Sequence, residues 1–522
     1  MEEEIEKRKD SIKKRFSSWI KDNYDKVFIV VLIVAFILRF LIFLKTAHQP
    51  LWYDEADYLS TAKKWGLGLN IKDIWYYRRG FLWPAIGAIF FKLGLGEIGM
   101  RFLVALLSTG IVASSYFLIA KMFDKKIALL VSIGIVFSWV SLFFTGRILT
   151  DTPATFFILL ALLFFWKGYV LKEGNKFLYL FGVFFALSLL TRFQFAMFAL
   201  PFFIFIFTKE KFKFVKNKHL WITAGLVFAI LLPFFILYWT HYGNIITDVF
   251  GHYFRLPTIA SEIPDTKTVS TLFDYFKDLP YILTKSVFVL FILGIFVFFQ
   301  DMFLGIDKIF KNEEIRKKFF IFLWIIVPFL FLGYITEYVE ERYILSTIPF
   351  LFLIAISPIM KVGNLINKHY SKISKRTIYA FSIILLLLLL TIGFGANIPS
   401  NYSWSNNLVD NKLASYLEVK QAGEWIKEHS NPGDAVISQS RPQIIYYSER
   451  DTYTFGQLGL NESAFQKNLS IIKPRYAMLS IYESHDPWIY SYPQSHNSTW
   501  TPVQAYYQSE QPVVVIYELK ED

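Results

Sequence analysis

The chain has 522 residues, of which 54% are hydrophobic, 19% aromatic and only 18% charged, with a net charge of +12. Soluble globular proteins contain about 25% charged residues, and their cores stop growing at about 250–300 residues, so this composition excludes a disordered chain and disfavours a soluble enzyme. The absence of cysteine excludes disulfides, thiol nucleophiles and Cys-ligated zinc. We therefore predict a membrane protein.

Apolar segments of the length that crosses a bilayer, about 20 residues, recur along the chain. We predict about eleven membrane helices, at 27–45, 98–120, 126–145, 152–170, 177–191, 194–208, 219–239, 282–300, 318–335, 343–360 and 377–397. The fifth and sixth are short, so residues 177–208 form either a tight hairpin of two spans or one broken span. Residues 1–26 contain no cleavage motif, so the first span is expected to stay as an anchor.

The basic residues predict which loops lie in the cytoplasm. With residues 1–26 inside, the cytoplasmic segments contain 29 Lys and Arg, and the outer loops contain 12 in a longer stretch of chain. Cytoplasmic loops are the basic ones in membrane proteins. This predicts a multi-pass protein of the cell membrane with a cytoplasmic N-terminus and an external C-terminus. Because the positive charge lies in short loops and not on a soluble face, we expect no nucleic-acid partner.

Residues 399–522 differ from the transmembrane domain, residues 27–398, because they are polar and contain no span. A helical pattern at 414–428 and strand-like segments at 435–438, 476–481 and 513–517 predict a small extracytoplasmic α/β domain. Four N-x-S/T sequons also fall here, beginning at Asn401, Asn461, Asn468 and Asn497. They agree with an external tail, although chance in an Asn- and Ser-rich segment explains them equally well.

Two outer loops are long, 46–97 and 240–281, and long loops in compact proteins are often functional. The first has two aromatic stretches typical of amphipathic helices on the membrane surface. Asp54, Glu55 and Asp57 lie in the first stretch, and carboxylates near a low dielectric are functional candidates. Alternatively, Glu55 or Asp57 pairs with Lys63 or Lys64 on the wet face of the helix, which we favour for Asp57.

Asp151 opens the fourth span and is a second external acid. Preceding Pro153, it also fits a helix start, and Arg147 could simply pair with it. Four further outer-side arginines are candidates to bind phosphate, because the guanidinium fork suits that group, although each could instead reach lipid headgroups. They are Arg78, Arg79, Arg192 and Arg342.

In layout, the chain resembles the integral-membrane glycosyltransferases of GT-C fold, most closely the group of protein O-mannosyltransferases and lipid A aminoarabinose transferases. The resemblance rests on Tyr53-Asp54-Glu55 after the first span, on 78–84, on Arg147-x3-Asp151, and on Glu341-Arg342-Tyr343 before a span that contains Pro349. The tail resembles the soluble domain of many archaeal and bacterial members. The order and sidedness of these short motifs support the resemblance, since none is specific alone.

The resemblance implies transfer of a sugar, a mannose-like hexose or a relative, from a polyprenyl- or dolichyl-phosphate donor to a protein, glycan or lipid acceptor on the outer face, with inversion. Asp54 would be the base, Glu55 would orient it or the sugar, and Asp151 would shape the acceptor or a metal position. Arg342, followed by Arg78 and Arg192, would bind the donor phosphate, with Arg79 and Tyr343 beside them. A divalent cation is possible, but we expect no obligatory metal or other cofactor.

Two other classes of function stay open. A transporter or flippase of lipid-linked sugar would also be apolar and basic inside, but it would be expected to place acids within its spans, which are almost free of acids here. A non-catalytic membrane scaffold that presents the tail to a partner is the other alternative.

Overall fold

The structure, a computed structural model, describes residues 23–72, 75, 79–243, 272–336, 339–370, 375–392, 399–484 and 486–520. The chain divides into two compact units. Unit 1 comprises residues 1–44, 103–146 and 150–409, and unit 2 comprises residues 45–102, 147–149 and 410–522. Residues 1–22 and most of the predicted outer loop 240–281 lie outside the described residues.

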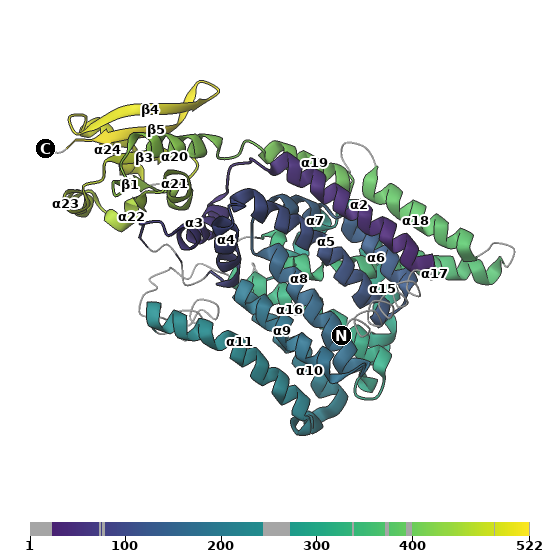
Figure 1. The fold of residues 1–522 in the computed structure, drawn as a ribbon. Coiled ribbons are helices and arrows are strands. Elements are labelled where there is room, and N and C mark those ends of the chain that lie inside the picture. The colour runs from purple at the N-terminus through teal and green to yellow at the C-terminus, as the bar shows by residue number, and fades with distance from the viewer. Residues whose placement is uncertain are drawn as a thin grey trace, which may run out of the picture. The chain divides into compact units, whose positions relative to one another are not determined.

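Unit 1 is helical, and its elements can be followed in Figure 1. Its long helices are α2 (Asn23–Thr46), α5 (Gly96–Met122), α6 (Lys125–Phe137), α8 (Asp151–Phe165), α9 (Asn175–Thr191), α10 (Ala199–Glu210), α11 (Lys218–Tyr242), α15 (Lys285–Leu304), α16 (Glu313–Ile335), α17 (Ile348–His369), α18 (Lys375–Thr391) and α19 (Asn401–Lys412). The shorter ones are α7 (Trp139–Phe143), η1 (Phe144–Gly146), η2 (Trp166–Val170), η3 (Phe193–Phe198), η4 (Lys211–Lys216), α13 (Asp274–Lys277), α14 (Leu279–Ile282), η7 (Ile306–Lys308) and η8 (Glu341–Thr347).

Where the structure describes the chain, every predicted span falls on apolar helical segments, and residues 393–397 of the last one lie outside that part. In the described part of the chain, eight helices are long and apolar enough to cross a membrane, and a ninth candidate is the bent pair 125–137 and 139–146. The two other predicted spans are shorter helices, Asn175–Thr191 and Thr377–Thr391. Large apolar side chains on one face of α2 are exposed, including Val30, Ile37 and Leu44. Such a face is stable against lipid and costly in water, so the chain is a multi-pass membrane protein.

Residues 177–208 form a hairpin of two helices. Helix α9 ends at Thr191, and Arg192 takes an extended conformation before η3 and α10. The Phe202 ring of α10 lies 4.8 Å from that of Phe181 and 5.9 Å from that of Phe185, both on α9. Phe181 precedes the turn at Arg192 by 11 residues and Phe202 follows it by 10, so the two helices are antiparallel neighbours.

The third predicted span is broken at Ser138, where α6 and α7 meet at a bend of 55°. The break exposes backbone groups that the helix would otherwise pair. Asn401 satisfies one of them, because its Oδ1 accepts from the Trp139 backbone N–H at 3.2 Å. The Asn401 side chain also donates to the Leu283 carbonyl at 3.1 Å and to Thr284 Oγ1 at 2.9 Å. This sequon asparagine is therefore a buried structural residue, which does not fit glycosylation.

A buried arginine joins α2 to the same region. Arg39 donates from Nε to Ser108 Oγ at 2.8 Å and from Nη2 to Ser141 Oγ at 2.9 Å. Its Nη2 also lies 3.4 Å from the carbonyl of Ile135, close to the helix break. The side chain is fully buried, so uncharged oxygens of α2, α5, α6 and α7 replace its hydration.

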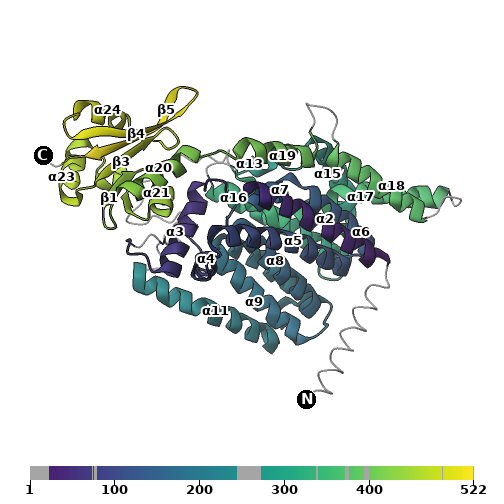
Figure 2. The same ribbon diagram turned by 45° about the horizontal axis from the view of Figure 1, so that its top comes forward.

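Unit 2 contains a five-stranded sheet of order β2-β1-β3-β5-β4, and Figure 2 labels β1, β3, β4 and β5 of it. Its strands are β1 (Ala435–Ser438), β2 (Asp451–Tyr453), β3 (Tyr476–Ser480), β4 (Trp500–Gln508) and β5 (Gln511–Leu519). Strand β1 pairs in parallel with β2 and β3, whereas β5 pairs antiparallel with β3 and β4. The expected strands correspond to β1, β3 and β5, and β2 and β4 were not expected.

Helices cover both faces of this sheet. Val436 and Met478 pack with α20 (Leu417–His429) and α21 (Arg441–Ser448) on one face. Their neighbours Ile437 and Leu479 pack on the other face, with α22 (Phe455–Leu458), α23 (Glu462–Ile472) and α24 (Pro487–Ser495). Successive strand residues point to opposite faces, so both cores come from the same short strands. The tail is therefore an α/β domain.

The first outer loop belongs to the same unit. It forms α3 (Tyr53–Leu67) and α4 (Leu82–Lys92), where the sequence predicts helices, and α3 packs on α21. Ser60 Oγ donates to the Pro442 carbonyl at 3.0 Å, and Tyr447 Oη accepts from the Leu51 N–H at 2.9 Å. The start of α3 is thus held by the tail.

We expect Asn401→Ala to destabilise the protein by about 2–3 kcal/mol, because it leaves a buried N–H and two buried oxygens without partners. Thermal unfolding in detergent measures this, with Asn497→Ala at an exposed sequon as the control. Equal melting temperatures for the two variants would contradict the assigned role.

Candidate active site

Two carboxylates at the start of α3 share one arginine. Arg79 donates from Nη2 to Asp54 Oδ1 at 2.6 Å and from Nε to Asp57 Oδ2 at 2.8 Å. The side chain of Asp54 is 28% exposed and that of Asp57 is 14% exposed. Asp54 is thus the carboxylate that a substrate reaches more easily. Arg79 holds both acids and does not present an unoccupied fork to a phosphate.

The two acids differ in environment as well as exposure. Burial raises the pKa of Asp57, and the opposing charge of Arg79 only partly offsets this. The interpretation of Asp57 as one end of a pair with Lys63 or Lys64 is wrong. Lys63 instead pairs with Glu449 at 2.7 Å, and Lys64 donates to the Ile71 carbonyl at 2.6 Å.

Glu55 is buried and fully engaged by the chain around it. Its Oε2 accepts from the Trp52 N–H at 2.8 Å, which forms the capping arrangement of α3, and its Oε1 accepts from the Ile148 N–H at 2.6 Å. Arg147 Nη1 lies 3.5 Å from Oε2. Both oxygens are therefore bound by groups of the protein, so the role of Glu55 is to hold the start of α3 against residues 147–148.

Arg147 completes this arrangement. Its guanidinium lies 3.6 Å from the ring centre of Trp52, and its side chain is 2% exposed. Burial lowers the pKa of Arg147 to about 10, although Glu55 opposes the shift. The sequence offered Asp151 as a partner for Arg147, but the structure gives it Glu55.

The tail contributes a group that the sequence did not indicate. Burial raises the pKa of Glu483 to about 7, and its Oε1 is buried without a hydrogen-bond partner among the described residues. Its charge acts on Tyr53 of α3, whose pKa rises to about 12, mainly through burial. It also acts on Tyr416, which has an unusual φ of 66°. Such backbone strain concentrates at functional sites.

Nothing local marks Glu483 in the sequence, because it is one of two acids, with Asp486, in a short loop after a strand. Tyr482 beside it packs on Tyr416, with ring centres 5.3 Å apart, and donates to Glu418 at 2.6 Å. Glu483 therefore belongs to an aromatic and acidic cluster formed by the tail and the start of α3.

Unit 1 assembles the other predicted residues. Arg192 Nη1 lies 2.9 Å from Asp151 Oδ1, and its guanidinium lies 4.3 Å from the ring centre of Tyr343. Arg342 lies 5.3 Å from the same ring and pairs with Glu340 at 3.1 Å. Asp151 and Arg342 are buried, and Arg192 is 13% exposed. Two guanidinium groups thus meet at one tyrosine, an arrangement suited to an anion.

Within unit 2, the structure brings together Tyr53, Asp54, Glu55, Arg79 and Arg147, and within unit 1 it brings together Asp151, Arg192, Arg342 and Tyr343. Arg78 lies outside the described residues. Among the residues that are described, no three His, Asp or Glu side chains form a group that could hold a metal ion.

We expect Glu55→Gln to lower stability by about 3–5 kcal/mol, because it leaves the charge of Arg147 buried without its partner. In addition, one Glu55 oxygen that accepts from a backbone N–H is replaced by an amide NH2 group, which cannot accept that hydrogen bond. Thermal unfolding measures the loss, and Arg147→Met in the same background should recover part of it. The control is Glu424→Gln on the exposed face of α20. An unchanged melting temperature for Glu55→Gln would refute the buried pair.

Glu483 should make stability depend on pH. Its pKa is raised from 4.5 to about 7, so the folded protein holds this proton more tightly than the unfolded chain. Stability from this group is full below about pH 4.5 and is lost as the pH rises through about 7. Glu483→Gln should flatten the fall in melting temperature between these values, whereas Glu424→Gln should not. Parallel curves for wild type and Glu483→Gln would contradict the shift.

Residues 78–239 match the family of dolichyl-phosphate-mannose-protein mannosyltransferases. No curated protein sequence matches the chain.

Solved structures are similar over nearly the whole chain. ArnT from Cupriavidus metallidurans in the apo state has a TM-score of 0.63 at 13% identity, over 95% of this chain and 98% of that one. The same protein bound to undecaprenyl phosphate has a TM-score of 0.62 at 12% identity, over 94% and 98%. The oligosaccharyltransferase AglB from Archaeoglobus fulgidus, in complex with an inhibitory peptide and a dolichol-phosphate, has a TM-score of 0.57 at 14% identity, over 96% and 75%.

These likenesses confirm the predicted fold, a helical membrane protein with a small C-terminal α/β domain. Residues 78–239 are thus similar to one mannosyltransferase family, and the whole chain shares the GT-C fold of ArnT and AglB.

Proposed function

We propose that the chain transfers a sugar from a polyprenyl-phosphate donor to an acceptor on the outer face of the membrane, with inversion at the anomeric carbon and Asp54 as the base. The observation that carries the proposal is Asp54, a partly exposed carboxylate held at a fixed position by Arg79 at the start of α3. A general base has to be oriented and within reach of the acceptor, and this carboxylate satisfies the first condition.

The donor class is supported by the similar structures, because ArnT was determined with undecaprenyl phosphate and AglB with a dolichol-phosphate. The matching family uses dolichyl-phosphate mannose and a protein acceptor by name. We extend the lipid phosphate to this chain and propose a mannose-like hexose or a related sugar. The acceptor is a hydroxyl-bearing protein, glycan or lipid.

In the proposed reaction, Asp54 takes the proton of the acceptor hydroxyl while its oxygen attacks the anomeric carbon of the sugar. The bond from that carbon to the phosphate oxygen breaks on the opposite side, which inverts the configuration. The lipid phosphate leaves with the bonding electrons, and Arg342 and Arg192 stabilise its negative charge.

The other residues have supporting roles in this proposal. Glu55 and Arg147 position the start of α3 and thereby Asp54. Asp151 holds Arg192, whose guanidinium Tyr343 covers on one side. Tyr53 lies next to the base and interacts with Glu483 of the tail.

Asp54→Asn should lower the turnover number by about 10²–10⁴-fold while the protein still folds, since general base catalysis contributes this much. The assay supplies purified protein in liposomes with radiolabelled polyprenyl-phosphate sugars and an envelope extract as acceptor, with and without EDTA. Loss of transfer with EDTA would reveal a required divalent cation.

The matched control is Asp57→Asn, which removes one of the two carboxylates on the same Arg79 and should keep more activity. Wild-type turnover in a folded Asp54→Asn protein would reject Asp54 as the base. Lipids that cross the bilayer without transferring sugar would favour a transporter instead.

A further inference from the structure

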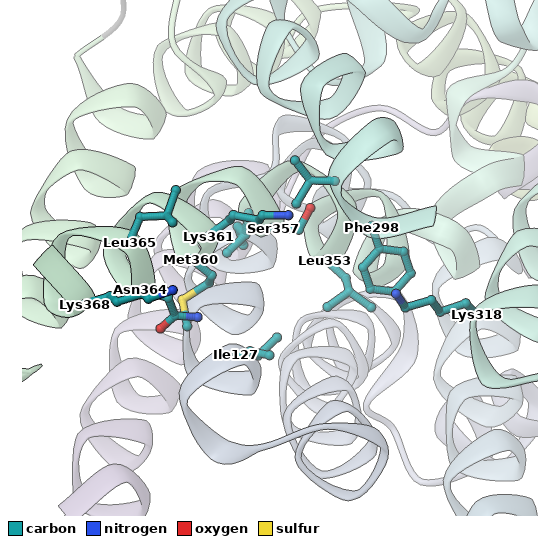
Figure 3. Close-up of a pocket in the computed structure, with 12 residues that line it drawn as sticks. Ile127, Phe298, Lys318, Leu353, Ser357, Met360, Lys361, Asn364, Leu365 and Lys368 are labelled. Carbon is teal, nitrogen blue, oxygen red and sulfur yellow. The ribbon is translucent and has the colours of Figure 1, made fainter. Parts of the chain in front are cut away.

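A pocket of about 530 Å³ lies among α6, α15, α16 and α17 of unit 1 (Figure 3). Apolar side chains such as Phe298, Leu353 and Met360 form most of its lining. This volume is within the range of sites for small ligands, about 300–1,000 Å³. None of the residues proposed above for sugar transfer lines it, so the pocket is separate from that chemistry.

The packing of α15 on α17 explains where the pocket begins. A Cβ added to Gly294 would lie 2.0 Å from the Ile354 carbonyl oxygen, so the two backbones touch there. In a regular helix the N–H of residue 358 would bind the Ile354 carbonyl, but Pro358 has no N–H. The carbonyl instead accepts from Ser357 Oγ at 2.7 Å. Phe298 follows Gly294 by about one turn, and beyond this contact the pocket opens.

One rim of the pocket is basic. Lys361, Asn364 and Lys368 line it from one face of α17, at spacings of three and four residues, and all three are exposed. Figure 3 shows their side chains along one side of the pocket, with Lys318 on the other.

The charges on the rim do not balance. Lys318 pairs with Asp301 at 2.9 Å, and the field of Lys361 also reaches this acid. Lys361 and Lys368 have no ion pair among the described residues. Two cations that have no ion-pair partner in the described part of the chain therefore border an apolar cavity between apolar helices.

We propose that this pocket binds an anionic phospholipid of the bilayer, with one acyl chain against the apolar lining and the phosphate on Lys361 and Lys368. The cavity opens among helices that cross the membrane, so lipid is the surrounding solvent. Basic pockets between membrane helices bind anionic headgroups. A zwitterionic headgroup carries a positive group of its own, so its electrostatic attraction to the two lysines is weaker.

The site lies at the ends of the helices joined by the basic segments 121–126, 301–318 and 361–376. The expected sidedness would put it in the cytoplasmic leaflet, but the lipid proposal does not depend on that assignment. It also does not rest on the proposed sugar transfer.

The test uses the full-length protein in detergent, with phosphatidylglycerol and phosphatidylcholine of identical chains. Native mass spectrometry measures bound lipid, and thermal unfolding measures the stabilisation. We expect tighter binding of phosphatidylglycerol in wild type. The double variant Lys361→Gln/Lys368→Gln should weaken it by about 25-fold, about 5-fold for each lysine.

The matched control, Lys213→Gln/Lys216→Gln, removes two exposed lysines of η4 that do not line the pocket and should leave binding unchanged. Met360→Trp fills the cavity without altering charge and should weaken binding of both lipids. Equal binding of the two lipids, or equal losses in the two double variants, would overturn the proposal. Displacement of phosphatidylglycerol by equimolar undecaprenyl phosphate would instead assign the pocket to the lipid carrier.

Discussion

Burial of the Glu55 carboxylate is the constraint on which the candidate base depends. Two backbone N–H groups, from Trp52 and Ile148, satisfy its two oxygens, and Arg147 supplies the opposite charge. A carboxylate without water has to be satisfied in this way, or the fold loses several kcal/mol. The direction in which α3 starts is fixed as a result. Asp54 directly precedes Glu55 in α3, so its position is fixed together with the start of the helix, and part of its side chain stays exposed.

The three neighbouring acids of α3 thus differ in role because their surroundings differ, and not because of their residue type. Both oxygens of Glu55 are bound by groups of the protein. Asp57 is largely buried beside Arg79, whereas Asp54 binds the same arginine but is more exposed. One cation holding two carboxylates limits the repulsion between them. The tail adds Glu483, which is also partly buried, and this burial raises its pKa.

The sequence predicted those features that depend on local hydrophobicity. The apolar segments lie in helices, because the hydrophobicity that marks a membrane helix is carried by its own consecutive residues and needs no distant partner. The partners of charged residues were predicted less well: Lys63 binds Glu449, from a segment almost 400 residues later, and Arg147 binds Glu55. Strand β2 has only three residues, too few for a recognisable alternation. Arg192 and Arg342, in contrast, were identified because outward arginines oppose the usual charge bias, and they do meet at Tyr343.

The buried Arg39 has a consequence for how the protein is made. Its hydrogen-bond acceptors Ser108 and Ser141 belong to segments that the ribosome synthesises much later than α2. An isolated α2 in lipid would expose this cation to hydrocarbon, which is unfavourable. We therefore expect α2 to enter the bilayer in a provisional position, close to the insertion machinery or to water. It reaches its final depth and rotation only after α5 and the α6–α7 pair have been inserted beside it.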